Sequence, residues 1–370
     1  MKRVAHLTSV HPRYDVRVFW KECRTLAAAG YAVSLIVADG KGNEEKDKVN
    51  IIDVGAHTGG RLSRMTKSTK RVFRKALELD ADLYHLHDPE LLPIAMKLKA
   101  KGKRVIFDSH EDFPADIMSK PYLGRVGRIV VSTLFASYEK RACRKLNHIV
   151  SATPAIREKF QRIGCKSLDV NNYPMLEELE ELLPWSQDRA AVCYIGAMTA
   201  IRGVPELVDA MSQTTTPARL ALAGSFTEAA TGEYCKKSQG WSSVDDHGFV
   251  GREKVREIMS RSVAGVVTFL SAPNHVDAQP NKMFEYMSAG IPVIGSNFPL
   301  WRSIIEGNKC GVCVDPADPM AVAAAIDYLF IHQAEAKAMG ENGRAAVLGR
   351  YNWDGEGKKL ISLYEDVLGK

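Results

Sequence analysis

The sequence predicts an α/β protein built from two doubly wound parallel-sheet domains. Three observations carry this prediction: short apolar runs alternate with helical patterns, the alternation restarts near the middle of the chain, and its 370 residues exceed an ordinary single domain. Alternation is typical of parallel sheets, because each strand needs a helical crossover to reach the next.

The first half supplies strands and helices in turn. Apolar runs expected as strands lie at 2–8, 31–37, 49–54, 81–87, 103–110 and 147–152. Helical patterns lie at 16–29, 61–79 and 122–146. A short strand follows, and the polar segment 171–174 is the natural linker. We therefore expect a first domain over residues 1–173.

The second half repeats the pattern. Apolar runs expected as strands lie at 190–196, 219–224, 245–251, 263–270, 291–296 and 311–316. We therefore expect a second domain over 174–353, with an amphipathic helix at 354–370 crossing back onto the first domain. Because ligands of open α/β sheets bind at the carboxyl ends of the strands, the two domains should face each other across a cleft.

Composition points to a protein of the cytoplasm. Hydrophobic residues at 45% and charged residues at 25% are ordinary for a globular chain. No run of 18 apolar residues and no signal-type apolar segment occurs. The seven cysteines are odd in number and scattered, which suits reduced thiols, and the pair Cys310 and Cys313 is expected in core strands rather than in a metal site.

The charge of the two halves differs in sign. Residues 1–173 hold 32 Lys and Arg against 19 Asp and Glu, whereas residues 174–370 hold 18 against 25. The excess in the first half gathers on the helix expected at 61–79, whose basic face is opposite an apolar stripe. Such a helix suits either an anionic inner-membrane surface or simple solvation. No nucleic-acid motif accompanies the charge, so no nucleic-acid partner is expected.

The most informative segment joins two apolar runs and reads QPNKMFEYMSAG over 279–290. A helix beginning at Asn281 would present free backbone N–H groups, and Lys282 would add a full charge for a phosphate. Glu285 follows one turn later, with apolar flanks that imply partial burial, and could accept two hydroxyl hydrogen bonds from a ribose. Asp277 precedes the helix, so the two acids could flank one ligand. An ordinary capped helix and a structural salt bridge remain the alternatives.

Other polar residues fall at predicted strand ends. Gly196 lets the backbone approach a ligand closely, and Arg202 before the next helix could fork onto a diphosphate. His110 and Glu111 end a strand of the first domain, where ligand contact and a structural role are equally expected. The preceding motif at Asp88 fits a plain helix N-cap. No dinucleotide-binding glycine motif and no P-loop occurs.

Taken together, these features resemble the retaining glycosyltransferases of family 4, which have the GT-B fold. The most specific match is 277–297, where Asp277 and Glu285 occupy the two acidic positions of the family signature, separated by seven residues and followed by a small-residue helix and Gly-x-Pro. Supporting matches lie at 194–210, 107–111, 85–93 and 351–368. The resemblance spans nearly the whole chain.

The resemblance implies a role for each matching residue. Glu285 would hold the ribose hydroxyls of a nucleotide sugar, and Asn281 and Lys282 would hold its diphosphate. Arg202 would neutralise the leaving phosphate. The implied catalytic residues are His110, Arg202, Lys282 and Asp277. The implied nucleotide contacts also include Gly196, Phe249 and Val250.

The sequence departs from the family pattern in three places. Asp277 replaces the usual glutamate, which shortens its reach to the sugar. Ala197 stands where a second basic residue is common. The first strand leads to a segment containing Asp15 and Arg17 instead of a glycine pair, and these residues, with Glu111, are expected on the acceptor side.

The expected activity is therefore metal-independent, retaining transfer of a hexose or N-acetylhexosamine from a nucleotide-diphosphate sugar. A UDP-sugar is the favoured donor, a lipid-linked saccharide of surface-polysaccharide assembly the expected acceptor, and no cofactor is expected. The protein should lie at the cytosolic face of the membrane. Alternatives that stay open are a soluble acceptor, a nucleotide-sugar epimerase on the same fold, and a non-catalytic sugar-nucleotide-binding protein.

Overall fold

The computed structural model describes residues 1–56, 59–60, 63–119, 123–178, 185–186 and 188–369. The chain forms two compact units, Met1–Asn172 with Trp353–Lys370, and Tyr173–Asn352. Each unit is an α/β domain built on a mainly parallel sheet, so the predicted fold class is confirmed. Residues 61 and 62 of the helix expected at 61–79 lie outside the described residues.

The first unit has an eight-stranded sheet in the order β3-β4-β2-β1-β5-β6-β7-β8. Its strands are β1 Arg3–Leu7, β2 Ala32–Val37, β3 Glu44–Lys46, β4 Val49–Asp53, β5 Leu83–Leu86, β6 Arg104–Ser109, β7 His148–Ser151 and β8 Ser167–Asp169. All pairs are parallel except β3 with β4. The sequence did not predict β3, because this edge strand consists only of charged residues and has no apolar run.

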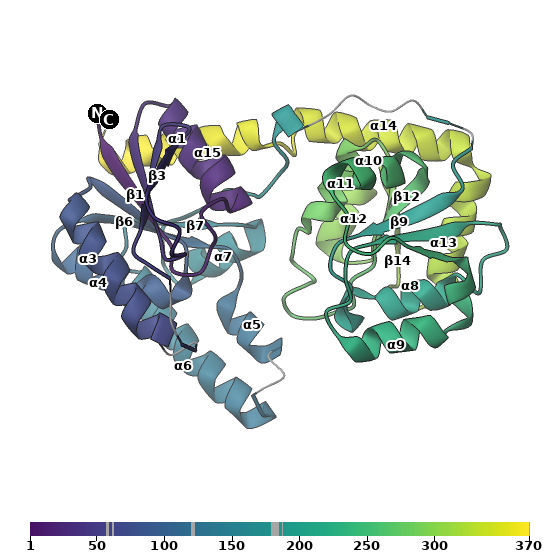
Figure 1. Ribbon diagram of the computed structural model, residues 1–370, viewed down its shortest axis with the longest axis horizontal. Helices are drawn as coiled ribbons and strands as arrows, with labels where there is room; N and C mark the ends of the chain where they lie inside the picture. Colours follow the sequence, from purple (N-terminus) through teal and green to yellow (C-terminus); the bar gives the residue numbers. More distant parts are fainter. Residues whose placement is uncertain (57–58, 61–62, 120–122, 179–184, 187, 370) are drawn as a thin grey trace. The chain divides into compact units, whose positions relative to one another are not determined.

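Helices cover both faces of this sheet. They are η1 Val16–Cys23, a π-helix, α1 Arg24–Ala28, η2 Arg64–Ser68, α3 Thr69–Leu79, η3 Pro89–Leu91, α4 Leu92–Ala100, α5 Phe113–Ser119, α6 Arg125–Cys143, α7 Pro154–Arg162 and α15 Trp353–Leu368. On one face of the sheet, alternate strand residues such as Leu7 and Tyr84 pack with residues of α3 and α4 in one apolar cluster. The opposite face is covered by η1 and α15, and α15 lies beside α1 (Figure 1).

The second unit has a six-stranded parallel sheet in the order β11-β10-β9-β12-β13-β14. Its strands are β9 Ala191–Ile195, β10 Arg219–Ala223, β11 Val244–Asp246, β12 Ser262–Val267, β13 Val293–Ser296 and β14 Gly311–Val314. Its helices are η4 Leu176–Glu178, η5 Ala200–Arg202, α8 Val204–Ala210, α9 Ala229–Lys237, η6 Gln239–Ser243, α10 Arg252–Ser260, α11 Asn281–Ser288, α12 Pro299–Ile305, α13 Pro319–Ile331 and α14 Gln333–Gly349. Helices α8 and α13 pack into the apolar cluster on one face, and α10, α11 and α12 into the cluster on the other (Figure 1).

The described part of the helix expected at 61–79 packs against the core of the first unit. Val72 and Ala76, from its apolar stripe, are completely buried in the core. Its basic residues Lys67, Lys70 and Arg74 are exposed. Val72 and Ala76 are therefore not free to enter a bilayer, whereas the exposed basic residues can contribute to binding one.

Candidate active site

Helix α11 begins at Asn281 and places Lys282 inside the second unit. The N-cap position is Pro280, which has no side-chain acceptor for the first backbone N–H groups of the helix. The Lys282 side chain leaves the first turn and is only 8% exposed. Its Nζ lies 3.7 Å from the centre of the Tyr194 ring on β9, and Phe269 is the next aromatic ring, at 5.4 Å. Because Lys282 contacts the end of β9, the helix start and the first strand of this sheet form one site.

Within the described residues, Lys282 Nζ has no hydrogen-bond partner. Burial, reinforced by the positive charge of Arg202, lowers the Lys282 pKa from 10.5 to about 7. Arg202 donates to the carbonyl of Ala197 at 3.1 Å, and its guanidinium carbon lies 5.5 Å from the centre of the Phe269 ring. Two cations thus share a partly buried site, and an anionic ligand would relieve their repulsion.

Other buried polar atoms in this segment also have no hydrogen-bond partner in the described part of the chain. They belong to Thr268, Asn274 and Gln279, which lie between the end of β12 and the start of α11. Buried polar groups are normally paired, so a run of unpaired groups calls for an explanation. A polar ligand bound beside α11 would supply one.

Two glycines allow the strand-end loops of β9 and β10 to touch. Gly224 has φ +149°, and a Cβ atom added there would lie 2.0 Å from the carbonyl oxygen of Gly196. Gly196 itself has φ +118°, and an added Cβ would lie 3.5 Å from Lys282 Nζ. Only glycine fits such backbone approaches without strain. The loops therefore bring main chain, not side chains, next to the Lys282 ammonium.

Beside these loops lies an apolar pocket of about 370 Å³. Its walls come from the loops after β9, β10 and β11 and from α10. The lining residues are Ile195, Gly196, Ala197, Ala223, Gly224, Ser225, Thr227, Phe249, Val250 and Val255. Phe249 is 88% exposed, so its ring is available to stack on a flat ligand. Pockets of this size and lining suit small organic ligands.

The two predicted acids lie on the solvent side of the segment. Asp277 and Glu285 are both exposed, as is Asn281. The partial burial expected for Glu285 from its apolar flanks is wrong, because Phe284 and Met287 point into the core while Glu285 takes the outer face of α11. An exposed carboxylate on the first turns of this helix is accessible to a ligand.

In the first unit, His110 belongs to a chain of polar side chains. Its Nε2 lies 3.2 Å from Asp108 Oδ2 and 3.3 Å from His87 Nδ1. Arg17 is buried and forks onto Asp108 with distances of 2.8 and 2.9 Å. Asp108 thus holds both predicted site residues, although the sequence assigned it no role. Its position at the end of a strand was the available signal.

The remaining acceptor-side residues differ in their contacts. Asp15 caps η1 by accepting from the backbone N–H groups of Arg17 and Val18, and it pairs with His11 at 3.2 Å. Glu111 is exposed. Asp88 occupies the helix N-cap position, but its carboxylate makes no capping bond and instead accepts from Thr8 and Ser9. These bonds tie the loop after β1 to the loop after β5.

Two family descriptions match this chain over adjacent ranges. Glycosyltransferase Family 4 matches residues 16–170, and Glycosyl transferases group 1 matches residues 177–346. The first range falls within the first unit, and the second range falls within the second unit. The second range contains the whole Lys282 site.

Relatives with curated descriptions are glycosyltransferases. An uncharacterized glycosyltransferase of Methanocaldococcus jannaschii is 22% identical over 266 residues, covering 69% of this chain and 65% of its own length, which is less than two thirds. The D-rhamnosyltransferase WbpZ of Pseudomonas aeruginosa is 24% identical over 284 residues, covering 74% of this chain and 71% of its own.

Solved structures show the same fold. Sucrose-phosphate synthase of Thermosynechococcus elongatus superposes with a TM-score of 0.79 at 18% identity and covers all of both chains. HepE of Anabaena, solved with UDP-glucose, superposes with a TM-score of 0.74 at 13% identity, covering 99% of this chain and 100% of its own. With both family matches and this fold, the chain belongs to the group 1, family 4 glycosyltransferases.

Proposed function

We propose that this glycosyltransferase takes a hexose or N-acetylhexosamine from a nucleoside-diphosphate sugar and transfers it, with retention, to a lipid-linked saccharide. The observation that carries the donor half is the Lys282 ammonium, which is buried and has no hydrogen-bond partner among the described residues. It lies beside Arg202, and a diphosphate is the ligand whose charge and size suit two such cations.

The rest of the donor site fits the other parts of a nucleotide sugar. The apolar pocket beside Gly196 and Gly224 would receive the base, with Phe249 at its edge. Glu285, exposed one turn into α11, would accept the ribose hydroxyls. We favour uridine as the base, and the UDP-glucose complex of HepE supports this choice.

The proposed chemistry is electrostatic. When the bond between sugar and phosphate breaks, negative charge grows on the diphosphate, and Lys282 and Arg202 would stabilise it. The acceptor oxygen would form its bond to the anomeric carbon on the face from which the phosphate leaves, so the sugar would keep its configuration. The departing phosphate would take the proton of that hydroxyl. No protein nucleophile and no metal takes part in this step.

The acceptor half of the proposal rests on the first unit. Helix α6 exposes an apolar row that includes Val126 at 75%, Val130 at 49% and Leu134 at 66%. Its last two turns carry the exposed basic residues Lys140 and Arg141. An exposed apolar row with a basic end suits the surface of an anionic membrane, where a lipid-linked acceptor would lie. No helix within the described ranges is long and apolar enough to cross a bilayer.

The donor assignment is tested by calorimetric titration of UDP, GDP and ADP into the wild-type chain and into Glu285→Ala. We expect one nucleotide to bind best and the substitution to weaken it by about tenfold, or roughly 1.4 kcal/mol. Glu233→Ala is the matched control, because Glu233 is an exposed acid on α9 in the same unit. No binding by any of the three nucleotides to the folded wild type would refute the donor site.

The acceptor assignment is tested by flotation with anionic vesicles. Replacing Val130 and Leu134 by Asp should reduce the bound fraction about tenfold, since it removes apolar area that the membrane would bury and adds negative charge that an anionic surface repels. Ile331→Asp, at an apolar position that is 63% exposed in the second unit, is the control. Equal flotation of all three proteins would remove the α6 surface from the proposal.

A further inference from the structure

Three histidines meet on the polar face of the first unit's sheet. His85 and His87 are two residues apart around β5, so their side chains share one face of the sheet. The parallel register pairs His6 on β1 with His85. All three imidazoles are buried, with exposures of 0 to 2%. The fold thus concentrates three imidazoles in the core of the first unit.

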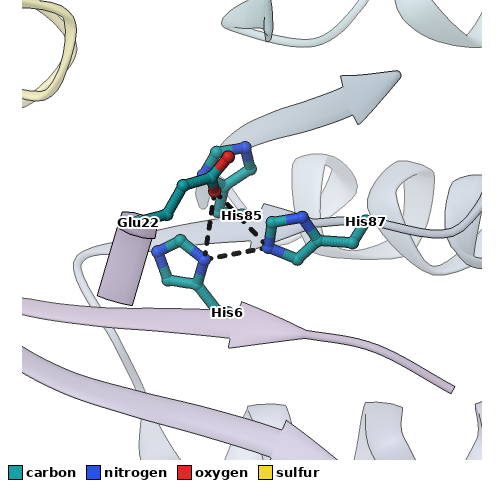
Figure 2. Close-up of side chains that lie close together, drawn as sticks. All are labelled: His6, Glu22, His85 and His87. Atoms are coloured by element: carbon teal, nitrogen blue, oxygen red, sulfur yellow. Dashed lines mark hydrogen bonds and ion pairs between the residues drawn. The ribbon is translucent and has the colours of Figure 1, made fainter. Parts of the chain in front are cut away.

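Glu22 on η1 adds a carboxylate to these histidines. Its Oε2 atom lies 3.8 Å from His6 Nδ1, 3.9 Å from His85 Nδ1 and 3.9 Å from His87 Nε2. The carboxylate points towards the imidazoles from the overlying helix (Figure 2). The four ligand atoms lie within 4.8 Å of one another. One oxygen and three nitrogens therefore converge on a common point.

The Glu22 carboxylate is poorly compensated by protein groups. It is completely buried, and neither oxygen has a hydrogen-bond partner within the described residues. Arg17 approaches Oε1 at 3.2 Å, but its guanidinium fork is directed to Asp108. Two buried carboxylates thus share one guanidinium. A buried charge without adequate partners is costly, so a further positive charge is needed near Glu22.

A metal ion could supply that charge, because one ligand atom from each of the three histidines lies within 4.8 Å of the others and of a Glu22 oxygen. Neutral imidazole is the form that binds a metal ion.

We propose that His6, Glu22, His85 and His87 bind one divalent transition-metal ion, with Zn²⁺ the favoured species. Three imidazoles and a carboxylate suit this class of metal. Two ligands about 2.0–2.1 Å from a tetrahedral ion lie about 3.4 Å apart, close to the observed oxygen-to-nitrogen distances of 3.8 and 3.9 Å. His6 Nδ1 and His87 Nε2, now 2.9 Å apart, would separate by about half an ångström.

Partners around the cluster already orient its rings. The Tyr364 hydroxyl on α15 lies 3.0 Å from His6 Nε2, while His6 Nδ1 is the nitrogen near Glu22. The same hydroxyl lies 2.8 Å from His85 Nδ1, so an ion bound through that nitrogen would displace this second contact. His87 Nδ1 lies 3.4 Å from Asp108 Oδ2. Carboxylates and hydroxyls bonded to the far nitrogen of a ligating imidazole are the usual supporting groups of a metal site. The ion would hold β1, β5 and η1 together, and through His87 and Asp108 it would fix the ring of His110.

The rival explanation is a proton. Burial, reinforced by the charge of Asp108, holds the pKa of Glu22 well above its usual range, so a proton shared between these two carboxyl groups could also remove the excess charge. The two explanations predict different results for Glu22→Gln. Gln resembles a protonated carboxyl group, so the variant should stay as stable as wild type if a proton removes the charge. Gln is a poor metal ligand, so the variant should lose the ion if a metal removes the charge.

The test measures metal in the full chain, purified through a tag without histidines. Wild type unfolded with chelator and refolded with Zn²⁺ should hold about one ion per chain after desalting and melt higher than the same protein refolded without metal. Glu22→Gln should hold less than about a tenth of an ion and melt at the same temperature with or without Zn²⁺. His148→Gln is the matched control, because His148 is a half-buried histidine on β7 outside the cluster and should leave the ion in place.

The measurements on the wild-type protein decide the proposal even if a variant fails to fold. Folded wild type with less than about a tenth of an ion, melting identically with and without Zn²⁺, would overturn it. Full occupancy in Glu22→Gln would also overturn it, because the ion would then lie elsewhere. A metal-free wild type together with an equally or more stable Glu22→Gln would establish the shared proton instead.

Discussion

The charge state of Lys282 makes nucleotide binding depend on pH in a calculable way. Its pKa is about 7 in the free protein and would return towards the ordinary 10.5 beside a bound diphosphate. Above pH 7 the free lysine is mostly neutral, so binding must take up a proton. The dissociation constant should then rise about fivefold from pH 7 to 8 and about tenfold more from pH 8 to 9.

The assay is calorimetric titration of a nucleoside diphosphate in buffers of different ionisation enthalpy. At pH 8 we expect an uptake of about 0.9 proton per nucleotide bound. The ligand's own last ionisation lies near pH 6, so the interval from pH 8 to 9 reports on the protein. Lys282→Gln should bind weakly with no proton uptake, whereas Lys254→Gln, on an exposed lysine paired with Glu257, should behave as wild type. A constant affinity from pH 8 to 9 without proton uptake in wild type would refute the reasoning.

Three further predictions concern stability. The folded-state pKa of Lys282 lies below its unfolded value, so the unfolded chain holds more protons between pH 7 and 10.5, and the buried lysine lowers the stability of the fold at pH 7. Lys282→Met should therefore raise the melting temperature at pH 7 by a few degrees. The same substitution should weaken nucleotide binding. Gly224→Ala should lower the free energy of unfolding by about 2–3 kcal/mol in a urea titration, since the new Cβ meets the carbonyl of Gly196, while Gly251→Ala, with open space around it, should change it little. Tyr364→Phe should cost about 2 kcal/mol by the same measurement, because two buried imidazoles lose their hydroxyl partner; a loss below about 0.5 kcal/mol would contradict that role.

The alternation of apolar runs was enough to predict both sheets. Each strand of a parallel sheet is buried on both faces and must be apolar, which is why the runs mark the strands so clearly. The edge strand β3 escaped prediction because an edge needs no apolar sequence. The helix at 61–79 was predicted as amphipathic, but periodicity alone does not say whether its apolar side meets a core or a membrane.

The α11 part of the candidate donor site was predicted from local sequence because it lies in one segment. Lys282 and Glu285 lie within a single helix, so their spacing was visible. The burial of Lys282 could not be seen in the sequence, because its contact with Tyr194 depends on how α11 packs against β9. The pairing of Asp108 with Arg17 likewise joins segments far apart in sequence.

The histidine cluster was missed for the same reason. Its members come from β1, η1 and β5, and they meet only because of the strand order and the register between His6 and His85. The available signal was the spacing of His85 and His87, two residues apart in the run expected as a strand at 81–87, which places both rings on one face. Histidines in a buried parallel strand need a reason, and both of these stood in that run.

The most direct test of the central claim is a crystal structure of the chain with a bound nucleoside diphosphate. The account predicts the diphosphate within about 3 Å of Lys282 Nζ, with Arg202 alongside it, and the base in the pocket beside Phe249. A diphosphate bound elsewhere on the second unit, with the Lys282 ammonium still against Tyr194 and no anion in reach, would contradict it.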